Sequence, residues 1–275
     1  MRRRAVALLA LAGTAAAGFL IVRSLVGVDT HGARIERYSI ASRYVHASLP
    51  QTVAVPAGRS VGRPLLVFLH GRTTDGNESN VNGAFFAALD GLGDRAPIVV
   101  FPNGGLQSYW HNRRDGAWAD YVMREVIPAA VRRLHADPRR VAIGGISMGG
   151  FGAYDIARSS PGRFCAVGGH SAAMWRTGGE TPAGAFDDAE DFARNDVIDA
   201  ARRRPSGYEG TPLWLDVGER DPFRSADTVL AQALRAGAAP IRFLVWPGAH
   251  TSDYWRRHWR DYLGFYASAL ARCRR

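Results

Sequence analysis

The stretch VAIGGISMGGF, residues 141–151, decides how the rest of the chain is interpreted. Its first three residues have the composition of a short buried strand, and residues 151–159 have that of a helix. Between them, Gly145 to Gly149 fits the pattern G-x-S-x-G, with Ser147 at its centre. Between a strand and a helix this motif forms a sharp turn that exposes the serine hydroxyl above the sheet edge. Glycine on both sides lets the two backbone segments pass close together. We therefore predict that Ser147 is a nucleophile.

The composition excludes several chemistries. The chain has 275 residues, is 47% hydrophobic and carries a formal net charge of +10, all of it from arginine because lysine is absent. Walker A phosphate loops, pyridoxal Schiff-base enzymes and Ser–Lys hydrolases all need a lysine. The basic residues are scattered and form no aromatic-interleaved motif, so no nucleic-acid partner is expected. Neither zinc-ligand spacing nor H-E-x-x-H occurs, so we expect no metal and no cofactor.

The N-terminus has the features of an export segment. Residues 2–4 are arginines, and residues 5–22 are uncharged and mostly apolar. A helix of that length spans about 27 Å, enough to cross a bilayer core. Two interpretations remain open for residues 1–23: a signal peptide cut after Ala15-Ala16-Ala17, or a membrane anchor, which the apolar residues beyond that site favour. Either one predicts an exported body, secreted or held at the outer face of the cytoplasmic membrane.

After a linker at 24–36, residues 37–275 alternate between apolar runs and helical patterns. We predict an antiparallel opening at 38–55, strands at 65–69, 98–101, 141–146, 164–172, 213–217 and 241–246, and helices near 85–89, 118–134, 151–159, 187–204, 225–236 and 251–271. This alternation predicts an α/β fold with a doubly wound, mostly parallel sheet of about eight strands. Residues 173–210 interrupt the rhythm and are expected to form a cap insertion after the sixth strand.

In such a sheet, site residues gather at the carboxyl ends of the strands. A serine nucleophile needs a neighbouring base, and a carboxylate must orient that base. His250 directly follows the last strand and is the predicted base. Asp221 follows the preceding strand and is the predicted acid, with Glu219 as the alternative. The resulting order Ser…Asp…His is the one expected on this kind of fold.

An oxyanion hole needs two backbone N–H donors. We expect them from Met148, which follows the nucleophile, and from Arg72, which follows the strand-ending pair His70-Gly71. Candidates for substrate contact are His70, Tyr109, Trp110 and Trp175. Packing in the core is the alternative for the three aromatic side chains.

The two cysteines, Cys165 and Cys273, leave one pairing open. Cys165 lies in an apolar run, which favours a small, unpaired core side chain. An exported protein could join the two cysteines in a disulfide, but we do not expect this bond.

The chain resembles the esterase-type α/β-hydrolases, the group of S-formylglutathione hydrolase, feruloyl esterases, polyhydroxybutyrate depolymerase-like enzymes and antigen 85 mycolyltransferases. The matching residues are Leu69-His70-Gly71, Phe101-Pro102-Asn103-Gly104, Ser108-Tyr109-Trp110 with Trp118, Glu125-Val126-Ile127-Pro128, Gly145 to Gly150, Gly218 with Asp221-Pro222, and Gly248 with His250. They cover residues 64–265. The resemblance is specific for the fold and the triad and weak for the substrate.

The resemblance implies a serine hydrolase that cleaves carboxylic esters of small molecules, lipids or polymers through an acyl-enzyme. The predicted export argues against a cytosolic glutathione ester. The alternatives are an exported acyltransferase of the mycolyltransferase type, a non-catalytic binding protein on the same fold, and a peptidase. The sequence also predicts a membrane association through residues 5–22.

Overall fold

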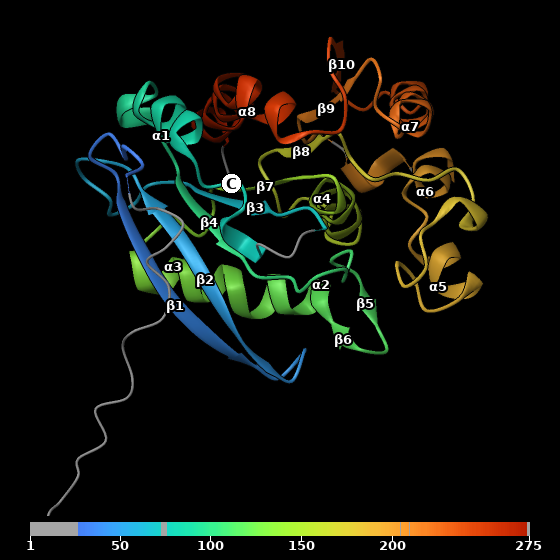
Figure 1. Ribbon diagram of the computed structural model, residues 1–275, viewed down its shortest axis with the longest axis horizontal. Coiled ribbons are helices and arrows are strands. Elements are labelled where there is room, and N and C mark those ends of the chain that lie inside the picture. Colours follow the sequence, from blue (N-terminus) through green and yellow to red (C-terminus); the bar gives the residue numbers. More distant parts are fainter. Residues whose placement is uncertain (1–26, 73–75, 204, 209, 274–275) are drawn as a thin grey trace, which may run out of the picture.

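The computed structural model describes residues 27–72, 76–203, 205–208 and 210–273 (Figure 1). The export segment expected at residues 1–23 lies outside this part of the chain. Among the helices of the described residues, none is both long and apolar enough to cross a membrane. The first strand begins at Arg34, inside the stretch that we assigned to a linker.

One sheet of eight strands, counted over the described residues, organises the molecule in the order β1-β2-β4-β3-β7-β8-β9-β10. The strands are β1 (Arg34–Ser42), β2 (Ala47–Val55), β3 (Leu65–Leu69), β4 (Ile98–Pro102), β7 (Val141–Ile146), β8 (Val167–His170), β9 (Leu213–Gly218) and β10 (Ile241–Trp246). β2 runs antiparallel to β1 and to β4, and the other neighbouring pairs are parallel. The predicted doubly wound, mostly parallel sheet with an antiparallel opening is confirmed.

Alternate side chains of the central strands enter two different cores. On β3, Leu66 and Phe68 pack with the core that contains α1 (Gly83–Asp90) and α8 (Ser252–Arg272), whereas Leu65, Val67 and Leu69 face the other core. Helices therefore cover both faces of the sheet (Figure 1). This explains why the strand sequences are continuously apolar rather than alternating.

The second core lies under five other helices of the described residues. These are α2 (Trp118–Tyr121), α3 (Ile127–Leu134), α4 (Met148–Arg158), α6 (Val197–Arg203) and α7 (Arg224–Ala236). The helix expected at 118–134 is present, but a π-helical turn at Val122–Val126 joins α2 to α3. A small hairpin, β5 (Asn112–Arg113) and β6 (Gly116–Ala117), precedes α2.

The cap insertion follows β8, the sixth strand of the sheet in chain order, as predicted. Its helical segment is two helices rather than one, α5 (Ala189–Arg194) and α6. The side chains at the junction account for the break. Asn195 donates its side-chain amide to the carbonyl of Asp191 and ends α5, and Asp196 accepts the N–H of Asp199 and begins α6. Such side chains cap helices by competing with the backbone bonds that would continue them.

A disulfide joins Cys165 to Cys273, with 5.6 Å between the two Cα atoms. The expectation of an unpaired core cysteine is therefore wrong, although Cys165 is buried as predicted. α8 runs to Arg272, so it carries Cys273 back across the sheet to the start of β8. This long helix, rather than any local spacing, brings the two cysteines together.

Candidate active site

Ser147 lies at the sharp turn between β7 and α4. Its backbone has φ of 54°, a left-handed conformation that is uncommon outside glycine and is typical of strained functional turns. A Cβ atom on Gly149 would lie 2.1 Å from the carbonyl oxygen of Leu69, and one on Gly145 would lie 2.5 Å from Gly149. Both positions therefore require glycine. The helix begins at Met148, three residues earlier than expected, so its N-terminus directly follows the serine.

Ser147, His250 and Asp221 lie in one hydrogen-bonded line. His250 Nε2 is 2.9 Å from Ser147 Oγ, and His250 Nδ1 is 3.0 Å from Asp221 Oδ2. The three residues come from the turns after β7, β9 and β10, at the carboxyl edge of the sheet. Glu219, the alternative acid, is exposed, and among the described residues the hydrogen bonds of the His250 ring go to Ser147 and Asp221 instead. This line is the geometry that a Ser-His-Asp hydrolase requires.

Two backbone hydrogen bonds join the loops that carry the histidine and the aspartate. The Arg220 N–H donates to the carbonyl of Gly248 over 2.9 Å, and the Glu219 N–H donates to that of Trp246 over 2.9 Å. A Cβ on Gly218 would lie 2.8 Å from Gly248, so the two backbones touch. This close approach explains why glycine stands at both loop entrances and fixes the spacing between His250 and Asp221.

Asp221 is 6% exposed. Burial alone would raise the pKa of its carboxyl group, but the hydrogen bond and charge of His250 and the N–H of Phe223 hold that pKa below its ordinary value. The Phe223 N–H lies 2.9 Å from Asp221 Oδ1. An ionised carboxylate at this position favours the imidazole tautomer that carries its proton on Nδ1, which leaves Nε2 free to accept the serine proton.

The predicted oxyanion donors lie beside Ser147. Met148 is the first residue of α4, a position whose N–H has no carbonyl partner within the helix. A Cβ on Gly71 would lie 3.3 Å from the Cβ of Ser147, so the backbone that leads to Arg72 passes directly over the serine. The structure thus brings both peptide groups close to Ser147.

Two of the residues proposed for substrate contact are wholly buried. His70 is 0% exposed, its Nε2 accepts the Gly104 N–H over 3.0 Å, and its Nδ1 lies 2.7 Å from the carbonyl oxygen of Gly71. Trp110 is also 0% exposed and donates its indole N–H to the His70 carbonyl. Neither side chain reaches the protein surface, and Trp110 follows the alternative of core packing. They hold the loop after β3 in place.

Tyr109 and Trp175 are also buried, at 4% and 7% exposure, but their rings belong to an aromatic wall that reaches His250. The ring centres of Tyr109 and Trp175 are 5.1 Å apart, and those of Trp175 and Phe223 are 5.8 Å apart. The ring of Phe223 in turn lies 5.1 Å from that of His250. Phe186 from the cap packs against both Tyr109 and Trp175. We did not predict the roles of Phe186 and Phe223. The position of Phe223, two residues after the predicted acid, is the only sequence signal for either of them.

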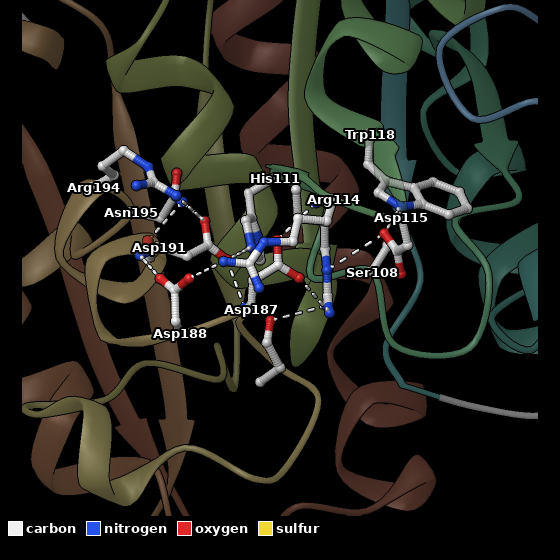
Figure 2. Close-up of polar contacts among 12 residues, drawn as sticks. Ser108, His111, Arg114, Asp115, Trp118, Asp187, Asp188, Asp191, Arg194 and Asn195 are labelled. Atoms are coloured by element: carbon white, nitrogen blue, oxygen red, sulfur yellow. Dashed lines mark hydrogen bonds and ion pairs between the residues drawn. The ribbon is translucent and has the colours of Figure 1, made fainter.

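A buried polar cluster fastens the cap to the segment that precedes α2. His111 Nε2 lies 3.0 Å from Asp191 Oδ2, and both side chains are 0% exposed. Figure 2 shows Asp187, Asp188 and Asp191 of the cap facing His111 and Arg114. Asp188 pairs with Arg114, and Asp187 accepts the Arg114 N–H. The His111 ring also stacks on Phe186 at 4.8 Å, so this cluster positions the aromatic wall.

A third hydrogen-bonded His–Asp pair lies beneath the turn that carries Ser147. His170, another strand-ending histidine, lies 2.7 Å from Asp216 through its Nδ1, and both side chains are fully buried.

Among the described residues, no group of three or more histidine, cysteine, aspartate or glutamate side chains could hold a metal ion.

Comparison with known proteins identifies the family. A family model described as "Putative esterase" matches residues 42–265. The chain belongs to this esterase family. Two curated relatives, Esterase Rv1288 and Esterase MT1326 from two strains of Mycobacterium tuberculosis, are each 27% identical to this esterase over 215 residues. Those matches cover 67% of this chain and 46% of each relative, so the chain spans about half the length of the curated relatives it matches.

Solved structures show the same α/β-hydrolase fold. A ferulic acid esterase aligns with a TM-score of 0.75 at 22% identity, over 86% of this esterase and 98% of that chain. The S-formylglutathione hydrolase from Agrobacterium tumefaciens gives 0.71 at 18%, over 87% and 96%. MPT51 (FbpC1) of Mycobacterium tuberculosis gives 0.65 at 16%, over 86% and 99%. The predicted fold class and the resemblance to esterase-type hydrolases are thereby confirmed.

Proposed function

We propose that this esterase-family chain hydrolyses carboxylic esters through an acyl-enzyme, with Ser147 as nucleophile, His250 as base and Asp221 as orienting acid. One observation carries the proposal. The Ser147 hydroxyl stands at a turn with a left-handed backbone, between a strand and a helix, and lies 2.9 Å from Nε2 of His250. The other ring nitrogen of His250 faces the buried carboxylate of Asp221. A serine hydroxyl is a poor nucleophile unless such a base takes its proton.

The reaction follows from this geometry. Ser147 Oγ attacks the ester carbonyl carbon, and its proton passes to His250 Nε2. The N–H groups of Met148 and Arg72 bind the oxyanion that develops on the carbonyl oxygen. His250 then gives its proton to the leaving alcohol, which departs as the acyl-serine ester forms. Water, deprotonated by His250, attacks that ester, and the acid leaves as Ser147 recovers its proton.

The aromatic wall favours a substrate whose acyl group is apolar and lies next to the cap. Tyr109, Trp175 and Phe223 line the approach to His250, and Phe186 backs them. Burial raises the pKa of Tyr109, against the opposing charge of Arg72. Its hydroxyl therefore stays protonated at neutral pH and can donate a hydrogen bond.

The cellular location belongs to the same proposal. Residues 1–23 act as a signal peptide or a membrane anchor, and the folded body works outside the cytoplasm. The Cys165–Cys273 disulfide supports this location, because such bonds persist in oxidising compartments and are rare in the cytosol. Fractionation of cells, with non-reducing thiol alkylation of each fraction, tests the location. Free thiols in the mature protein would contradict it.

A fluorophosphonate probe tests the nucleophile. Full-length protein in mild detergent should be labelled at Ser147, as mapped by mass spectrometry. The label should disappear in Ser147→Ala and fall strongly in His250→Ala. A folded protein that takes no label and turns over no ester would overturn the proposed function and favour a binding role. If Ser147 is labelled but the acyl group of the substrate passes to added alcohols rather than to water, the protein is an acyltransferase.

A further inference from the structure

Asp216, on β9, is a buried carboxylate that four side chains contact. Its side chain is 0% exposed. The partners of Oδ1 are His170 Nδ1 at 2.7 Å and the indole N–H of Trp214 at 2.7 Å, and those of Oδ2 are the hydroxyls of Tyr254 at 2.8 Å and Tyr262 at 3.0 Å. These contacts occupy the four lone-pair sites of the carboxylate. Asp216 is therefore a fixed point inside the molecule.

The same cluster touches the backbone of the proposed site. The Ser147 N–H donates to the carbonyl of His170 over 3.1 Å, and the Ser171 N–H donates to that of Asp216 over 2.7 Å. Tyr254 lies in the first turn of α8, four residues after His250. A Cβ on Gly248 would lie 2.6 Å from the Tyr254 ring, so the loop that carries His250 rests directly on that ring.

We propose that Tyr254 is a positioning residue for His250, a role that rests on the proposed function. The bond from its hydroxyl to Asp216 fixes the first turn of α8, and with it the distance from the imidazole to Ser147. Thr251 adds to this anchor, because its side-chain oxygen accepts the Tyr254 N–H over 3.4 Å. Reacting groups need placement to within a fraction of an ångström, and a misplacement of about 1 Å can cost about 100-fold in rate.

Tyr262 provides a matched control within the same cluster. Its hydroxyl donates to the same oxygen of Asp216 as that of Tyr254, but it lies two turns further along α8. Within the described part of the chain, the hydrogen bond and ring contacts of Tyr262 do not reach residues 247–251. Tyr254→Phe and Tyr262→Phe each remove one hydroxyl, keep the ring, and leave Asp216 with three partners. They should therefore cost similar stability, and only the first should disturb His250.

The experiment compares the two variants with the wild type in full-length protein. For a small activated ester, Tyr254→Phe should lower kcat by about 10- to 100-fold with KM within about twofold, whereas Tyr262→Phe should keep kcat within about twofold. The fluorophosphonate labelling rate should fall in parallel with kcat. Equal losses of kcat in the two variants, or no loss in Tyr254→Phe, would overturn the proposal.

A second readout needs no substrate and separates this inference from the proposed function. The proton shared by His250 Nδ1 and Asp221 should give a far-downfield NMR resonance in the wild type and in Tyr262→Phe. In Tyr254→Phe it should broaden or disappear. If the wild type shows this resonance but cleaves no ester, the proposed function fails and the positioning role still stands on the NMR comparison. An unchanged resonance in Tyr254→Phe refutes the positioning role.

Should Tyr254→Phe fail to fold, Thr251→Val loosens the same turn from the exposed surface of the molecule. It should give a smaller loss of kcat and a weaker resonance in the same direction. Normal kcat and an intact resonance in Thr251→Val would then refute the positioning role.

Discussion

His250 Nε2 lies 2.9 Å from Ser147 Oγ, although 103 residues separate the two side chains in the sequence. Parallel strands bring them together, because β7 and β10 both end at the same edge of the sheet. The imidazole also touches an aromatic ring on two sides, Phe223 at 5.1 Å and Trp255 at 5.0 Å. These two ring contacts flank the imidazole, and its hydrogen bonds then keep Nε2 directed toward Ser147.

The first prediction distinguishes the two candidate acids. Asp221→Asn should lower kcat by about 10³- to 10⁴-fold, because an amide stabilises the wrong imidazole tautomer and cannot stabilise the imidazolium. Glu219→Gln, two residues away and exposed, should change kcat by less than about twofold. Steady-state hydrolysis of a p-nitrophenyl ester measures both. A larger loss from Glu219→Gln than from Asp221→Asn would reverse the assignment.

The sequence predicted what depends on periodicity and on strand ends. Continuously apolar runs such as 65–69 located the buried strands, and the residues that follow them, His250 and Asp221, assembled as expected. It could not predict which polar or aromatic side chains the loops would bury. His70 directly follows a strand and Trp110 lies in a loop, as exposed site residues do. Only the packing of the loops shows that both side chains are buried.

Long-range pairings were also beyond the sequence. Cys165 meets Cys273 only because α8 extends across the sheet for its full length. Tyr254 and Tyr262 lie on one face of that helix, which their spacing indicates. Nothing in the spacing reveals that both hydroxyls converge on a single carboxylate, Asp216.

The second prediction concerns the disulfide. The bond closes a sequence separation of 108 residues, and removing such a constraint typically costs about 2–4 kcal/mol of unfolding free energy. Cys165→Ser combined with Cys273→Ser should therefore lower the stability in urea by about that amount. Activity at room temperature should persist, because the bond joins the start of β8 to the end of α8, away from the carboxyl edge. Reductant should destabilise the wild type equally and leave the double variant unchanged.

The third prediction is an acid destabilisation caused by His70. Burial lowers the pKa of His70 to about 4, from an ordinary value near 6.5 in the unfolded chain. Above about pH 6.5 both states hold a neutral imidazole. As the pH falls toward 4 the unfolded state gains a proton that the folded state resists. Stability should drop by about 3 kcal/mol across this window.

Urea unfolding at several pH values checks this slope. His70→Asn should be less stable at pH 7, since it disturbs the loop after β3, but should have a shallower slope between pH 6.5 and 4, because only the contributions of other groups such as His258 and Asp221 remain. His46→Asn, at an exposed position with a left-handed backbone that asparagine tolerates, should keep the slope. If His70→Asn keeps the full wild-type slope, the acid destabilisation comes from other groups and not from His70.

The last prediction concerns the cap and the acyl group. Asp191 holds His111, and His111 stacks on Phe186 of the aromatic wall. Asp191→Ala leaves His111 Nε2 and the Asp187 N–H without their buried partner, so the cap should loosen. The value of kcat/KM for an ester with a bulky aromatic acyl group should fall about tenfold or more. Acetate ester hydrolysis and fluorophosphonate labelling should change by less than about twofold, because neither uses the wall.

Glu190→Ala is the matched control on α5. Among the residues that the structure describes, its exposed carboxylate makes one long ion pair, with Arg194 at 4.0 Å, so both esters should be cleaved as by the wild type. Hydrogen exchange of the cap amides gives the physical readout, since Asp191→Ala should speed exchange in residues 187–195 and spare β7. If both esters lose the same factor in Asp191→Ala, the cluster supports the triad as a whole. The aromatic wall would then not select the acyl group.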